Sequence, residues 1–168
     1  MKRGWAMLAA ALALVGGAAD GHTISPVVVT DLDGHDIAVP ANLPGGRTLI
    51  ILGFHHADQA IVAAWKTGLG LAAGTPNWLE IPVIGVSSTM IRGMIRSGMR
   101  GTYHAAAERA HVAPAFGDAA ALARGFGVTP DRVAVIVVDH DGRVIAEAAG
   151  AYSANAATPL LAAWHGGD

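Results

Sequence analysis

Apolar residues along the chain gather in short continuous runs, separated by polar turns and by segments with helical spacing. Three such runs are Thr48 to Phe54, Trp78 to Val86 and Val133 to Val138. A strand with one solvated face alternates apolar and polar residues, whereas a strand buried on both faces of a sheet does not. These runs therefore predict central strands of a buried sheet.

Helical spacing marks the segments between and after these runs. The expected helices cover residues 55–71, 90–98, 119–126 and 154–165. In the first helix, the apolar side is expected to consist of Ala60, Ile61, Ala64, Trp65 and Leu69. Asp118 and Gly127 are suited to cap the two ends of the third helix.

Two hairpins complete the expected elements. Asp31-Leu32-Asp33-Gly34 lies between strand-like residues 27–30 and 37–39, and Asp139-His140-Asp141-Gly142 lies between residues 133–138 and 143–148. Asp-Gly between apolar strands favours a tight turn, and neither segment continues to the glutamate of a calcium loop. The order of elements predicts an α/β fold: a mixed central sheet with helices on both faces and an N-terminal β-hairpin extension.

The first nineteen residues differ from the rest of the chain. Lys2 and Arg3 precede an apolar run from Ala6 to Val15, and small residues follow at Gly17 and Ala19. This pattern is typical of a secretory signal peptide, which predicts a leader at 1–19, a domain at 20–168 and a periplasmic or secreted location. The alternative is an uncleaved leader that associates the protein with a membrane.

Composition excludes several functions. The formal net charge is -2 and the basic residues form no stripe, so nucleic acid is not an expected partner. The chain has no cysteine. Thiol oxidoreductase and thiol peroxidase activities are therefore excluded, because the thiolate is the nucleophile in both.

The most suggestive polar cluster is His55-His56-Ala57-Asp58, between a predicted strand and the helix that follows. Sites of α/β proteins often lie at such strand ends, so His55, His56 and Asp58 could act as acid and base or bind a metal. The other interpretation is a polar connection with a capping aspartate. Adjacent histidines in a strand point to opposite faces, which favours the second interpretation, and the sequence assigns no metal or cofactor.

Arg92, Arg96 and Arg100 follow one another at a spacing of four and therefore share a helical face. They could bind an anionic protein partner, a lipid headgroup or a carboxylate, or they could form a solvated helix face. Met90, Met94 and Met99 lie beside them and suit either an adaptable partner groove or the core.

Several short motifs together resemble known proteins. Leu49 to Phe54 followed by a helix, Phe126-Gly127-Val128, and the hairpin with Gly142-Arg143-Val144 resemble the thioredoxin-like superfamily. Trp65 in the first helix, the strand with Ile81-Pro82-Val83 and the segment Met90 to Gly101 are similar to bacterial relatives of the mitochondrial ATP-synthase assembly factor family.

The resemblance implies a thioredoxin-like domain that assists the assembly of a membrane complex. The Cys-x-x-Cys position of that fold corresponds to residues 55–60 here, and Pro130 is offset from the place of the usual cis-proline. We therefore expect an exported, non-catalytic binding or assembly factor for an envelope protein or complex. The alternative is a metal- or histidine-dependent periplasmic enzyme that uses His55, His56 and Asp58.

Overall fold

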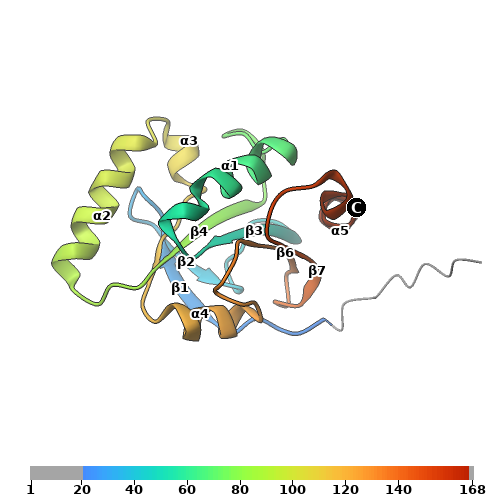
Figure 1. Ribbon diagram of the computed structural model, residues 1–168, viewed down its shortest axis with the longest axis horizontal. Coiled ribbons are helices and arrows are strands. Elements are labelled where there is room, and N and C mark those ends of the chain that lie inside the picture. The colour runs from blue at the N-terminus through green and yellow to red at the C-terminus, as the bar shows by residue number, and fades with distance from the viewer. Residues whose placement is uncertain (1–20, 167–168) are drawn as a thin grey trace, which may run out of the picture.

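The computed structural model describes residues 21–166 (Figure 1). The predicted leader at 1–19 lies outside these residues. The strands are β1 (Val27–Thr30), β2 (Asp36–Val39), β3 (Arg47–Gly53), β4 (Trp78–Ile84), β5 (Ala115–Phe116), β6 (Ala134–Asp139) and β7 (Val144–Ala149). The helices are η1 (His56–Asp58, a 3-10 turn), α1 (Gln59–Gly68), α2 (Thr89–Thr102), α3 (Ala106–Arg109), α4 (Ala119–Phe126) and α5 (Ala154–His165).

Five strands form one mixed sheet in the order β5-β4-β3-β6-β7. Strand β3 lies at its centre, parallel to β4 and antiparallel to β6. Strands β1 and β2 form a separate antiparallel hairpin. The mixed sheet and the N-terminal hairpin extension predicted from the sequence are both confirmed.

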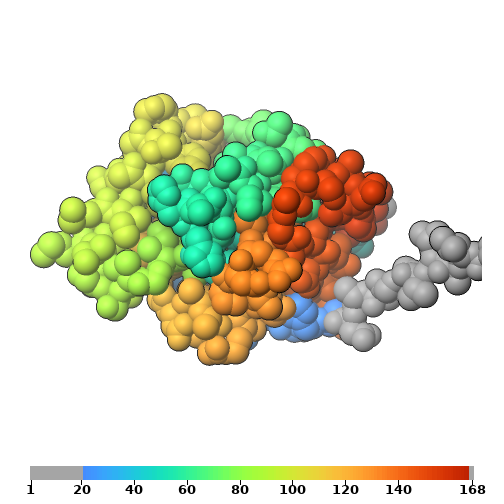
Figure 2. All heavy atoms as spheres, viewed as in Figure 1, coloured from blue at the N-terminus to red at the C-terminus, as the bar shows by residue number. Residues whose placement is uncertain are grey.

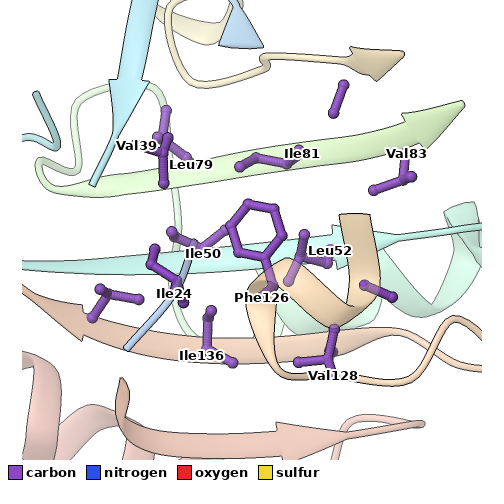
Figure 3. Packing of buried hydrophobic residues seen from close by; sticks show 14 of the residues in the cluster. Ile24, Val39, Ile50, Leu52, Leu79, Ile81, Val83, Phe126, Val128 and Ile136 are labelled. Carbon is purple, nitrogen blue, oxygen red and sulfur yellow. The ribbon is translucent and has the colours of Figure 1, made fainter. Parts of the chain in front are cut away.

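Alternate residues of the central strands feed two apolar cores, one on each face of the sheet. Ile50 and Leu52 of β3 point to the face that α4 and the β1–β2 hairpin cover, where the Phe126 ring lies over the strands (Figure 3). Leu49 and Ile51 point to the other face, which α1 and α5 cover. Helices therefore cover both faces (Figure 1), as predicted.

Helix α4 begins and ends where the sequence predicts. The Asp118 side chain accepts hydrogen bonds from the backbone N–H groups of Ala120 and Ala121. Gly127 follows the last turn with a φ of 70°, a left-handed conformation that glycine adopts without steric cost.

Two helix expectations are wrong in part. In α1 the buried residues are Val62 and Trp65, with Leu69 just after the helix, whereas Ala60 and Ala64 are exposed. The expected and the observed faces share Trp65, and the buried face is rotated because Val62 offers more apolar surface to the sheet than Ala60 and Ala64 do. Helix α2 also runs to Thr102, four residues beyond the expected end.

The Asp31 carboxylate stabilises the turn between β1 and β2. The Asp31 carboxylate accepts hydrogen bonds from the backbone N–H groups of Asp33 and His35, and the His35 ring nitrogen lies 2.9 Å from its second oxygen. Burial raises the pKa of Asp31, but the hydrogen bonds from His35 and Asp33 outweigh it, so the net shift is downward. The hydrogen bond and charge of Asp31 raise the pKa of His35.

We expect Asp31→Asn to lower the pKa of His35 toward its ordinary value of 6.5, measured by an NMR titration of the imidazole. In the wild type, the stabilisation from His35 is lost as pH rises through its raised pKa, and that from Asp31 is lost as pH falls through its lowered pKa. Asp36→Asn is the control, because the Asp36 carboxylate accepts its hydrogen bond from the Thr30 hydroxyl and not from His35. A His35 titration unchanged by Asp31→Asn would contradict the assignment.

Among residues 21–166, none of the helices has the length and apolar character needed to cross a membrane.

Candidate functional site

The strand-to-helix connection after β3 holds the first cluster predicted from the sequence. Asp58 is buried, and its Oδ2 accepts hydrogen bonds from the backbone N–H groups of Phe54 and His55, both at 2.8 Å. The His55 ring nitrogen is 3.6 Å from the same oxygen, which is too long for a hydrogen bond. The Asp58 carboxylate therefore orders the backbone of this connection.

The histidines of the connection lie at the surface. The His55 side chain is 58% exposed, and His56 is exposed as well. Within residues 21–166 no three His, Cys, Asp or Glu side chains gather closely enough to hold a metal ion. In the same part of the chain the one cis peptide bond precedes Pro40, so Pro130 is trans.

A cavity of about 580 Å³ lies beside this connection, between α1, β4 and α2. In Figure 2, the α2 atoms form a separate yellow-green lobe next to the teal atoms of the connection and α1. The apolar lining includes Val62, Pro82, Val83, Ile95 and Met99. The lining thus brings Ile95 and Met99 of α2 together with residues of α1 and β4.

A partly buried ion pair forms the polar part of the lining. Lys66 of α1 donates a hydrogen bond to Glu80 of β4 at 2.8 Å, and the Tyr103 hydroxyl donates to the other Glu80 oxygen at 3.1 Å. The Lys66 ammonium also lies 5.5 Å from the Trp78 ring centre and 5.3 Å from that of Tyr103. Burial, and then the nearby Glu80 charge, raises the pKa of Tyr103, so its hydroxyl stays protonated as a donor.

Sequence reasoning missed this ion pair. Glu80 is the one charged residue in the apolar run Trp78 to Val86, and a charge in a buried strand needs a partner. That signal was available. Its partners could not be identified in the same way, because Lys66 and Tyr103 lie 14 and 23 residues away in the chain.

The predicted arginine face of α2 turns partly toward the protein itself. The guanidinium groups of Arg92 and Arg96 lie 5.7 and 5.6 Å from the centre of the Phe116 ring. Arg92 Nε also donates to the Val86 carbonyl at 3.0 Å. Arg100 is 54% exposed and lies 3.7 Å from Asp33.

The opposite face of α2 is apolar and open to solvent. Met90 is 76% exposed, Met94 68% and Ile91 45%, and no residue of the helix is buried. In Figure 1, α2 stands at the left edge of the molecule, beyond the strands. We call Met90, Ile91 and Met94 the outer face of α2.

The comparisons identify the fold. No family model matches the chain, and no curated protein matches it. The exposed lipoprotein thioredoxin Etrx1 of Streptococcus pneumoniae TIGR4 superposes with a TM-score of 0.57 at 11% identity, covering 82% of this chain and 98% of its own. A thio-disulfide isomerase from Thermus thermophilus gives 0.54 at 18%, covering 84% and 93%.

A putative electron transfer protein from Aquifex aeolicus VF5 superposes with a TM-score of 0.55 at 14% identity, covering 86% of this chain and 94% of its own. At such identities the likeness shows the fold alone. Residues 21–166 therefore have a thioredoxin-like fold, and the chain contains no cysteine. Its relation to the ATP-synthase assembly factor family stays a prediction.

Proposed function

We propose that this protein is an exported, non-catalytic binding or assembly factor, which contacts an envelope protein or complex through the outer face of α2. The observation that carries the proposal is the uncovered apolar side of this helix, formed by Met90, Ile91 and Met94. Exposed apolar surface of this kind is costly in water, and it is typical of interaction sites. Methionine suits such a surface because its flexible side chain adapts to a partner.

The absence of cysteine at the position of the reactive pair supports a non-catalytic role. Residues 55–60 correspond to the reactive cysteine pair of this fold and contain no cysteine, and the Asp58 carboxylate already accepts hydrogen bonds from two backbone N–H groups. That carboxylate is poorly placed to move a proton for a substrate.

The charge of α2 indicates the chemistry of the partner. The helix carries Arg92, Arg96 and Arg100 and no acidic residue, in a chain whose formal net charge is -2. Arg92 and Arg96 stack on Phe116, which leaves Arg100 as the most available cation. A protein surface with an apolar centre and acidic residues around it would complement this helix.

We expect Met90→Glu with Met94→Glu to reduce capture of the partner from a solubilised envelope fraction by at least about tenfold, because it places two charges at the centre of an apolar contact. Capture is measured by affinity purification and quantitative mass spectrometry. Both positions are exposed, so circular dichroism should show an unchanged fold.

Val28→Glu is the matched control for this experiment. Val28 is also an exposed apolar residue, at 64%, but it lies on β1 instead of α2. Capture should survive that change. Equal capture by the wild type and the double variant would exclude the outer face of α2 as the contact surface.

A further inference from the structure

We propose that the cavity beneath α2 binds a small, uncharged and largely apolar molecule that carries a carbonyl group at one end. This site lies on the inner side of α2, whereas the proposed partner surface lies on its outer face. The inference therefore goes beyond the proposed function and does not depend on it.

The size and walls of the cavity suit such a ligand. Its volume of about 580 Å³ lies within the range of roughly 300–1,000 Å³ that small-molecule sites occupy. Ile95 and Met99 of α2 line it together with Val62 of α1 and Pro82 of β4. Because α2 buries none of its own residues, its inner side has apolar surface that a ligand can cover.

Lys66 supplies a hydrogen-bond donor at the polar end of the cavity. An ammonium group has three N–H donors, and among residues 21–166 the hydrogen-bond acceptor that Lys66 contacts is Glu80. The rings of Trp78 and Tyr103 hold the ammonium in place without using its remaining donors. A ligand carbonyl oxygen can accept one of these donors while the rest of the ligand contacts the apolar walls.

The charges around the cavity favour an uncharged ligand. Lys66 and Glu80 neutralise each other, and the Asp58 carboxylate lies on the same lining. A ligand carboxylate would meet two carboxylates and one ammonium that is already paired, while the two histidines of the lining, His55 and His56, are exposed to water. A ligand amine would meet Lys66, and Glu80 already accepts two hydrogen bonds. Either charged group would lose its hydration without gaining equivalent hydrogen bonds or an unpaired opposite charge in the cavity.

The first test uses 6-propionyl-2-(dimethylamino)naphthalene, an uncharged ketone whose fluorescence shifts to the blue in apolar surroundings. Met99→Trp should weaken its binding at least about tenfold, because the indole occupies cavity volume. Ser97→Trp is the matched control, because Ser97 is exposed on the same helix and does not line the cavity, and it should bind the probe as the wild type does. Unchanged binding by Met99→Trp, or equal losses in both variants, would overturn the proposal.

The second test asks which polar group the cavity prefers, and it measures how strongly different competitors displace the same probe. We expect 2-nonanone to displace the probe at a concentration about tenfold lower than nonanoate or nonylamine, which have the same chain length. 2-Methyl-1-nonene, which has a CH2 group in place of the carbonyl oxygen of 2-nonanone, tests the donor, and 2-nonanone should also compete at a concentration about tenfold lower than this alkene. The double variant Lys66→Met with Glu80→Gln removes the ammonium donor and should abolish the advantage of 2-nonanone over the alkene. Equal competition by the alkene in the wild type, or an advantage of 2-nonanone over it that survives in the double variant, would overturn the assignment of Lys66 as the donor.

Discussion

Replacing Trp65 with alanine is expected to lower the free energy of unfolding by about 4 kcal/mol. The Trp65 side chain is fully buried between α1 and the sheet, and its ring meets that of Tyr152 edge to face at 5.2 Å. Its indole N–H donates to the Gly150 carbonyl at 2.8 Å. Alanine would leave a cavity in the core and a backbone carbonyl without its donor.

This loss is measured by urea unfolding followed by circular dichroism. Trp65→Phe is the control, because phenylalanine keeps an aromatic ring in the core and removes the N–H donor; we expect it to cost about 1–2 kcal/mol. A loss below about 2 kcal/mol for the alanine variant would mean that the surrounding core collapses around the gap. It would also question the role of Trp65 in fixing α1, which carries the neighbouring Lys66.

The sheet could be predicted closely because its signal is local. The apolar runs of β3, β4 and β6 and the Asp-Gly turns are each readable within a few residues, and the strands lie where these patterns indicate. The burial of α1 was harder to predict. Ala60 and Val62 point to different sides of the helix, and each side carries apolar residues, so spacing alone does not select one, whereas packing selects the side with the larger side chain.

The candidate site depends on contacts between distant segments. Spacing alone places Arg92 and Arg96 on one face of a helix, but that face turns inward because Phe116 of β5 offers a ring for the guanidinium groups. A helix viewed by itself cannot indicate which side the rest of the chain covers. For this reason the sequence pointed to the arginines as the contact surface, whereas Met90 and Met94 are the more exposed residues.

The second large effect is expected at the polar end of the cavity. Lys66→Met should lower the free energy of unfolding by about 3 kcal/mol, because it leaves the Glu80 carboxylate with one donor, the Tyr103 hydroxyl. The Glu80 side chain is 10% exposed and that of Lys66 is 24% exposed. Water reaches the pair in part, which places the expected cost at the low end for a broken buried ion pair.

Combining Lys66→Met with Glu80→Gln should recover most of that stability, since the double variant buries no charge and the glutamine oxygen can still accept from Tyr103. Urea unfolding of the wild type, the Lys66→Met variant and the double variant measures this recovery. If the double variant were as unstable as Lys66→Met alone, the cost would come from the lost contacts of the lysine with the Trp78 and Tyr103 rings. If it recovers, the ion pair adds little net stability over an uncharged lining, which is the expectation for a site that uses the ammonium group to bind a ligand.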